Sequence, residues 1–300
     1  MNKWMKRTSA ALATLAVLGV MAALTGKYMG ERKLQRVIKV AVQPVPVNTS
    51  PAALAQGRYL FSTRGCADCH GPTGAGKEVI NSGAMLVVSP NISPGANSVT
   101  SGYTATDWVR TLRHGVKPDG TPIMIMPSED YARLTDDDLA SIIAYVTQLA
   151  PVPGQPRTIR LPFMVKVMYG FGAIHDAAEI IDHTLAPEQP VKVEVSIAHG
   201  KYVAHSCVGC HGANLSGGRI PGSPPQWPAT ANLTPGQGSA MVRYPTPEAF
   251  MAMLRSGKRP DGTPISGVMP FGSLKQMNDT DVSALHAYLK TLPPRAAGGR

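Results

Sequence analysis

The sequence predicts an all-α protein built from two tandem copies of one small domain, preceded by an apolar N-terminal helix. Three observations lead to this prediction. A five-residue cysteine motif occurs twice, and the sequence around it repeats as well. Several of the repeated stretches carry a helix cap followed by apolar residues at helical spacing. A long uncharged stretch lies close to the amino terminus.

The N-terminal stretch has the composition of a targeting segment. Residues 8–26 carry no charge, and Lys3, Lys6 and Arg7 precede them. Nineteen uncharged residues are enough to cross a bilayer as a helix. Residues 1–26 are therefore predicted to be a signal peptide, with a small-residue cleavage site at residues 20–22, or a retained membrane anchor. The basic residues place the start of the chain in the cytoplasm and everything after residue 26 outside it.

The internal repeat divides the rest of the chain into two domains and two linkers. The domains are predicted at residues 51–155 and 191–295, which is a normal domain size. A linker of basic residues and prolines covers residues 27–50, and an interdomain linker covers residues 156–190. The repeat is visible where residues 91–94 match 232–235, residues 108–113 match 250–255, and residues 139–149 match 282–292.

Helix signals occur at corresponding places in the two copies. Ser50 followed by a proline predicts a helix start, as does Thr246 followed by a proline. Thr135 precedes three aspartates and then apolar residues at helical spacing. Between these helices, residues 71–102 and 212–247 are long and rich in Gly, Pro, Ser and Asn. Loops of this length are expected in a compact domain only where they wrap around something.

The cysteine motif points to what the loops enclose. Residues 66–70 and residues 207–211 each read Cys-x-x-Cys-His, and together they contain all four cysteines of the chain. This pattern is typical of c-type haem attachment. Two thiols on one short turn add to the two vinyl groups of one haem, and the adjacent histidine becomes the proximal iron ligand. Cys66, Cys69, Cys207 and Cys210 are thus predicted to hold two covalently bound haem c groups, with His70 and His211 as iron ligands.

A Cys-x-x-Cys pair can also be a redox dithiol or part of a zinc site. A redox dithiol does not need the histidine that follows each pair. A zinc site built from two cysteines and a histidine needs a fourth ligand, which is often a further cysteine, and the sequence has none to spare. Both alternatives account for less of the pattern than haem does.

A methionine is predicted as the second axial ligand in each half. Met126 and Met269 are each followed by a proline, and each comes after a matched Pro-Asp-Gly-Thr-Pro-Ile segment. A soft thioether on a loop bounded by proline is suited to closing a haem iron from the distal side. The alternative is that both are ordinary core methionines. Met124 competes with Met126, but only Met126 aligns with Met269.

Several histidines lie outside the two motifs. His114 is expected to pack against a loop or a haem propionate, with a distal catalytic role as the alternative. Most of the remaining histidines, in or near the interdomain linker, are expected to face solvent, and contact with a haem is the alternative. They are His175, His183, His199 and His205.

The net charge of +10 is unevenly distributed. Residues 1–50 hold eight basic and one acidic residue, whereas residues 51–155 hold seven and nine. Residues 191–300 hold eleven basic and five acidic residues. Such a contrast between domains can steer different redox partners to each, although ordinary surface variation explains it equally well. Nucleic-acid binding is not expected, because the basic block near the start flanks the targeting segment.

Both halves resemble class I cytochrome c domains, and the chain as a whole is similar to bacterial dihaem cytochromes c. The resemblance extends to the cytochrome c subunits of membrane-bound alcohol and gluconate dehydrogenases. They share a Pro-Asn-Ile-Thr-Pro element, here residues 90–94 and 231–235, and an Arg-x-Gly…Asp-Gly element, here residues 113–120 and 255–262. Those subunits usually carry three haem motifs, and this chain has two, so membership of such a complex does not follow.

The resemblance implies two haem groups with His/Met ligation in a protein that is exported to the periplasm or anchored in the inner membrane. It implies an electron carrier with no catalytic residues, which relays electrons between a donor and an acceptor protein, such as a membrane dehydrogenase or a terminal oxidase. The alternative is a catalytic dihaem enzyme of the peroxidase or thiosulfate-oxidising type, which needs one haem with an open or unusual sixth ligand.

Overall fold

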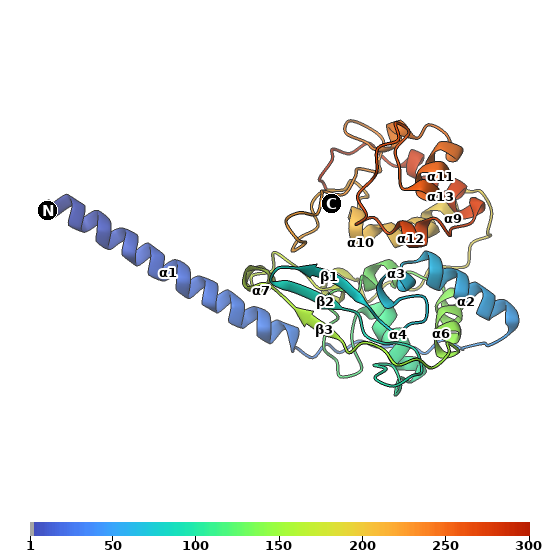
Figure 1. The fold of residues 1–300 in the computed structure, drawn as a ribbon, viewed down its shortest axis with the longest axis horizontal. Coiled ribbons are helices and arrows are strands. Elements are labelled where there is room, and N and C mark those ends of the chain that lie inside the picture. The colour runs from blue at the N-terminus through green and yellow to red at the C-terminus, as the bar shows by residue number, and fades with distance from the viewer. Residues whose placement is uncertain (1–2) are drawn as a thin grey trace.

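The structure, a computed structural model that describes residues 3–300, contains two helical domains and a long projecting helix (Figure 1). It is rich in helix, with 45% of residues helical and 7% in strands. The first domain contains α2 (Pro51–Thr63), α3 (Cys66–His70), α4 (Ala105–His114), α5 (Ser128–Tyr131) and α6 (Asp136–Thr147). The second contains α9 (Ile197–Ala204), η1 (His205–Cys207), α10 (Val208–His211), η2 (Met241–Arg243), α11 (Pro247–Ser256), α12 (Phe271–Leu274) and α13 (Asp279–Thr291).

The predicted helix caps are confirmed. The Ser50 side chain accepts a hydrogen bond from the backbone N–H of Ala53, and Thr246 accepts one from Ala249. Thr135 caps α6 by accepting from the N–H of Asp138. Each cap satisfies an N–H group that has no partner inside the first helical turn, so these residues set where the helices begin.

A pair of crossing helices forms the centre of each domain, and a glycine sets how closely they approach. A Cβ on Gly57 of α2 would lie 1.9 Å from the carbonyl oxygen of Ser141 in α6. A Cβ on Gly200 of α9 would lie 1.9 Å from the carbonyl oxygen of Ala284 in α13. Only glycine permits this backbone contact, and it lets the apolar faces of α6 and α13 close over their own domain cores.

A small antiparallel sheet accompanies the helices of the first domain. It consists of β1 (Glu78–Ser82), β2 (Met85–Val88) and β3 (Thr158–Arg160), in the order β1-β2-β3. Gly83 turns the β1–β2 hairpin with a φ of 57°, in the left-handed region. The all-α prediction missed this sheet, because its strands are short and β3 comes from the segment predicted as an interdomain linker. The helix-rich architecture is otherwise confirmed.

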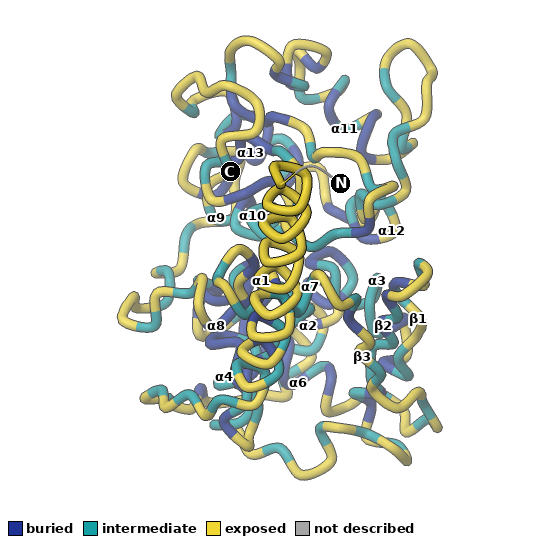
Figure 2. The backbone as a smooth tube through the Cα atoms, turned by 90° about the vertical axis from the view of Figure 1, so that its left-hand side faces the viewer, coloured by how far each residue is buried: buried dark blue, intermediate teal, exposed yellow. Residues whose placement is uncertain are grey.

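The N-terminal helix α1 (Lys3–Leu34) continues beyond the uncharged stretch and ends against the first domain. It is the one helix within residues 3–300 that is long and apolar enough to cross a membrane, by length and composition. Its outer part stands free of the body and is exposed on all sides (Figure 2). Its last turns pack against α7 (Phe163–Gly170), which with α8 (Ala177–Ile180) lies between the two domains in the sequence.

We expect Gly57→Val to destabilise the first domain by about 3 kcal/mol, because the added atoms would collide with the backbone of α6. The same result is expected for Gly200→Val in the second domain. Gly102→Val is the matched control, since nothing lies within 4 Å of a Cβ at that position. Urea unfolding of the haem-loaded protein measures the difference. Equal stability of Gly57→Val and Gly102→Val would contradict the close helix crossing.

Candidate haem-attachment sites at the domain interface

Each cysteine motif forms a short helical turn that follows the first helix of its domain. Helix α3 carries Cys66, Cys69 and His70, while Cys207 ends η1 and leads into α10. Cysteines three residues apart in a helical turn lie on the same side. None of the four cysteines takes part in a disulfide. This is the donor arrangement that one haem with two vinyl groups requires in each domain.

The buried thiols do not have the electrostatics of a redox dithiol. Burial raises the pKa of the Cys66 thiol to about 12 and that of Cys207 to about 12. Reactive Cys-x-x-Cys pairs instead have a thiol with a lowered pKa, which makes the thiolate available at neutral pH. Among the described residues no group of three or more His, Cys, Asp and Glu side chains is arranged to hold a metal ion. The donor set therefore fits haem better than it fits a redox disulfide or zinc.

The motif histidines are oriented in the same way in both domains. The Nδ1 atom of His70 lies 2.9 Å from the carbonyl oxygen of Pro90, and that of His211 lies 2.8 Å from the carbonyl oxygen of Ala231. Burial lowers the pKa of both imidazoles, although each carbonyl partly opposes this effect. A neutral ring that donates from Nδ1 keeps the lone pair of Nε2 for a metal. The backbone thus leaves Nε2 of each histidine available to a metal, as the predicted role of iron ligand requires.

The two Met-Pro segments also have the same local geometry. The backbone N–H of Ser128 donates to the carbonyl of Met126 at 2.8 Å, and the N–H of Phe271 donates to the carbonyl of Met269 at 2.8 Å. Met126 packs against the core of the first domain, in the cluster that Cys66 also contacts, and Met269 packs against the second core together with Cys207. Met124 instead packs against the cluster beneath the small sheet.

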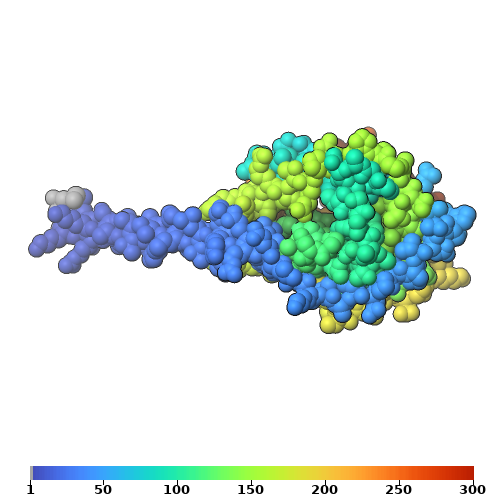
Figure 3. Space-filling view, turned by 90° about the horizontal axis from the view of Figure 1, so that it is seen from below, coloured from blue at the N-terminus to red at the C-terminus, as the bar shows by residue number. Residues whose placement is uncertain are grey.

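Two repeated side-chain motifs hold the long loops. The Asn91 Oδ1 atom accepts from the backbone and hydroxyl of Ser93, at 2.9 and 2.8 Å. Asn232 binds Thr234 in the same way at 2.9 and 2.8 Å. The Asn91 amide donates to the carbonyl of Val152, and the Asn232 amide donates to that of Arg295. Both loops are therefore tied to the chain that follows the last helix of their domain. Figure 3 shows a hollow in the underside of the first domain, bordered by segments from the middle of the chain.

The two attachment turns face one another across the contact between the domains. Helix α5, which follows the first Met-Pro, contacts η1 and α10, while α12, which follows the second, contacts α2 and α3. The carboxylate of Asp130 in α5 accepts a hydrogen bond from the backbone N–H of Gly209 at 2.7 Å. In the corresponding contact, Asp68 Oδ1 lies 2.5 Å from where a Cβ on Gly272 would be. Each cysteine motif therefore packs against the Met-Pro helix of the other domain (Figure 1).

A reciprocal pair of tyrosine–aspartate hydrogen bonds joins the first helix of each domain to the last helix of the other. The hydroxyl of Tyr59 in α2 donates to Asp281 at 2.8 Å, and that of Tyr202 in α9 donates to Asp138 at 2.5 Å. The symmetry is broken by Arg64, whose guanidinium forms a buried ion pair with Asp281 at 2.9 Å. The interface residues were not predicted from the sequence, since nothing in the spacing of Tyr59 and Asp281 indicates contact.

The histidines in or near the linker differ in exposure: His175 is exposed as predicted, His183 and His205 are partly buried, and His199 is buried. His199 is buried, and its Nε2 atom lies 2.7 Å from Asp281 Oδ1, inside the domain contact. The prediction that it faces solvent was wrong, because α9 begins at residue 197 and turns this side chain towards α13. His183 packs on His114, with their Nδ1 atoms 3.0 Å apart. Burial, followed by the charges of His183 and two arginines, lowers the pKa of His114 to about 4.

Comparison with known proteins gives the family of each half. Residues 52–146 match the family described as cytochrome c oxidase, cbb3-type, subunit III, and residues 197–293 match the family described as cytochrome c. The chain contains two cytochrome c domains. Together with the Cys-x-x-Cys-His motif in each domain, these matches support two covalently bound haem c groups.

Three relatives illustrate the range of similar cytochromes. A fructose dehydrogenase cytochrome subunit of Gluconobacter japonicus is 29% identical over 86% of this chain and 56% of the relative. A dihaem cytochrome c-type protein of Cereibacter sphaeroides is 27% identical over 83% of this chain and 91% of the relative. An alcohol dehydrogenase (quinone) cytochrome c subunit of Gluconobacter oxydans is 24% identical over 81% of this chain and 55% of the relative. The match thus spans a little over half the length of these dehydrogenase subunits and most of the dihaem cytochrome.

We expect Asp281→Asn to weaken the contact between the cytochrome c domains by about 3 kcal/mol, because it leaves the buried Arg64 guanidinium without its counter-ion. Burial alone would raise the pKa of Asp281, but Arg64 and the hydrogen bonds of His199 and Tyr59 outweigh it and hold this pKa below 3.8. The stabilisation is therefore complete above the ordinary pKa and is lost as pH falls through the lower folded-state value.

Urea unfolding at neutral pH and at a series of acid pH values tests this. The difference between wild type and Asp281→Asn should shrink only below about pH 4. Asp279→Asn on the same helix is the control, since Asp279 is 77% exposed and its ion pair with Arg255 should contribute little. A pH-independent difference would contradict the role of the ionised carboxylate.

Proposed function

We propose that this chain relays single electrons between two redox partners through one haem c in each domain. The relatives are named as cytochrome subunits of dehydrogenases or as a dihaem cytochrome, which supports an electron-transfer protein. When bound, haem supplies the reversible one-electron chemistry, and the protein sets its ligands, its surroundings and its neighbours.

In each domain we assign four residues to one haem. Cys66 and Cys69 would form the two thioether bonds of haem 1, with His70 and Met126 as axial ligands. Haem 2 would be held in the same way by Cys207, Cys210, His211 and Met269. The matching turns around the two methionines and the matching hydrogen bonds of the two histidines support this assignment. With both a histidine and a methionine bound, each iron would have no open position for a substrate, which favours a carrier over an enzyme.

The observation that carries the proposal is the position of the two attachment turns. Each turn packs against the Met-Pro helix of the other domain, and Asp130 ties the second turn directly to the first domain. This arrangement would hold the two haem groups within one chain, so that electrons could pass between them without a diffusing carrier. The buried contacts of Tyr59, Arg64 and Tyr202 hold the two domains in this arrangement.

The surroundings of the chain are part of the proposal. We propose that it works on the outer side of the inner membrane, with residues 1–26 as its membrane anchor or signal peptide. A membrane dehydrogenase is the proposed electron donor, by analogy with the names of the relatives, and a terminal oxidase or another redox protein is the acceptor. The excess of basic residues in 191–300 suits a partner with an acidic surface.

Met126→Ala and Met269→Ala should each remove the thioether ligand of one haem. Each variant should lose about half of the weak long-wavelength absorption that thioether ligation gives to ferric haem. Its potential should fall, because methionine ligation raises it. Each should also bind carbon monoxide at one haem when reduced, whereas the wild type should bind none. Met124→Ala is the matched control. Unchanged spectra in Met126→Ala would overturn the ligand assignment, and carbon monoxide binding by the wild type would favour an enzyme.

Electron exchange between the two haems should depend on the domain contact. In the Met126→Ala background the two haems absorb differently, so reduction with less than one equivalent of a one-electron donor allows each to be followed. Adding Tyr59→Phe and Tyr202→Phe should slow the exchange several-fold by loosening the contact. Tyr288→Phe is the control, since its ring packs inside the second domain. Equal exchange rates in all variants would contradict a relay through this interface.

A further inference from the structure

Helix α7 carries an apolar stripe that neither domain core uses. Met164, Met168 and Phe171 are spaced four and three residues apart, so they lie on one side of the helix. These residues are 57%, 37% and 55% exposed. Three large apolar side chains gathered on one exposed helix face, rather than scattered singly, indicate a surface that contacts something apolar.

The adjoining face of α7 packs closely against α1, and the Phe171 ring lies at the edge of this contact. A Cβ on Gly170 would lie 2.0 Å from the carbonyl oxygen of Gly26, and one on Gly30 would lie 2.2 Å from that of Lys166. Small residues at these positions let the two helix backbones touch, as in helix pairs within membranes. Gly26 contacts Phe171, whereas Gly30 contacts Lys166, so the two helices run antiparallel.

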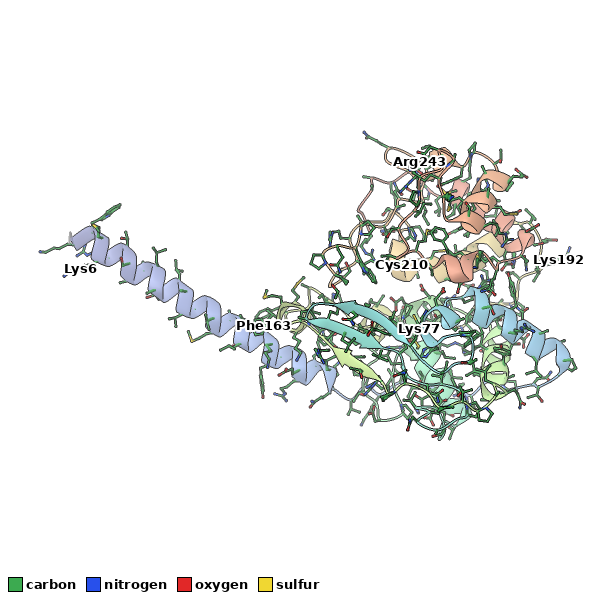
Figure 4. All side chains as sticks on the ribbon, in the orientation of Figure 1. Lys6, Lys77, Phe163, Lys192, Cys210 and Arg243 are labelled. Atoms are coloured by element: carbon green, nitrogen blue, oxygen red, sulfur yellow. The ribbon has the colours of Figure 1, made fainter. Side chains whose placement is uncertain are left out.

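Ion pairs hold this contact in place. Glu31 lies between Lys27 and Lys166, at 3.1 and 2.9 Å. Beyond the end of α1, Arg36 pairs at 2.7 Å with Asp176, which is fully buried. The segment that carries the apolar stripe is therefore fixed on α1 and cannot turn independently of it. Figure 1 shows α7 at the edge of the body from which α1 projects, and Figure 4 labels Phe163 at the start of α7.

The length of the uncharged part of α1 sets the depth of the stripe. Residues 8–26 would span about 28 Å as a helix, close to the roughly 30 Å of hydrocarbon in a bilayer. The stretch ends at Gly26, the residue that Phe171 touches, and Lys27 is the first charge beyond it. With residues 8–26 across a bilayer, Phe171 would lie at the level where hydrocarbon gives way to lipid headgroups, and Met168 and Met164 would lie progressively above it.

We propose that the apolar stripe of α7 is a second membrane contact, in which Phe171 and Met168 enter the interfacial layer of the phospholipid bilayer beside α1. This proposal rests on the retention of α1 as an anchor, which is part of the proposed function. A single helix leaves the attached domains free to tilt, whereas a helix and an adjoining apolar face define a plane. The stripe would thereby set which faces of the two cytochrome domains are presented to partners in the same membrane.

Photocrosslinking of the full-length, haem-loaded protein tests the occupant of this surface. Benzoylphenylalanine is introduced in place of Phe171 or, as a second exposed position, Met168. The protein is placed in vesicles of phosphatidylcholine and phosphatidylglycerol with radiolabelled acyl chains and is then irradiated. Both positions should crosslink to lipid, with Phe171 more efficient than Met168 because it lies deeper.

Two reference positions separate the membrane contact from the anchor. Leu18, in the uncharged part of α1, should crosslink strongly to lipid if the anchor is embedded. Val242 is 72% exposed in the second domain, far along the chain from α1, and should not crosslink. Labelling at Leu18 without labelling at Phe171 and Met168 overturns the second contact and leaves the anchor intact. In native membranes, a crosslink from Phe171 to another protein instead of lipid also overturns the proposal. Absence of labelling at Leu18 would count against the anchor itself.

Discussion

The arrangement of the two domains depends on the interactions of the buried Asp281 carboxylate. From the first domain, Tyr59 donates a hydrogen bond to this carboxylate and Arg64 forms an ion pair with it. Within its own domain, His199 forms a hydrogen bond with it. A carboxylate with so little solvent around it is stable only while these partners remain. The contact therefore favours one relative position of the domains, since any other would separate Asp281 from Arg64 and Tyr59. The facing cysteine turns follow from that position.

Duplication explains why the interface is nearly symmetric, and a few substitutions explain why it is not fully so. Tyr59 and Tyr202 occupy matching places, as do Asp281 and Asp138, and each tyrosine crosses to the aspartate of the other domain. Arg64 has no counterpart in the second domain, so charge is concentrated around Asp281. Similarly, Asp130 binds the second cysteine turn, while the matching residue Ser273 has a buried hydroxyl without a hydrogen-bond partner. These differences give the two sites unlike surroundings, which is one way to separate their potentials.

The segment between the domains connects them and also packs against the first domain and α1. It contributes β3 to the sheet of the first domain, and its helices α7 and α8 form the surface on which α1 ends. Glycines allow the close helix contact, and ion pairs fix its orientation. The domains, the sheet and α1 are therefore mechanically continuous, so the orientation of α1 is passed to both cysteine turns.

The sequence by itself determined the features that depend on neighbouring residues. The repeat, the helix caps, the apolar helix and the paired cysteine motifs could all be predicted, because each is encoded within a few turns of chain. The preference for Met126 over Met124 came from alignment of the repeats, and packing now places only Met126 beside the core that Cys66 contacts. Whether these residues hold iron stays a prediction.

Only the tertiary structure decided what meets across long separations in the chain. The hydrogen bond of Tyr59 with Asp281, the burial of His199, the pairing of β2 with β3 and the docking of α1 on α7 have no local signature. From the sequence, a polar side chain on a helix face is predicted to be exposed to solvent, even where a distant helix covers it in the folded protein. The physical reason is that burial and charge pairing are properties of the assembled surface, whereas caps and periodicity are properties of the local chain.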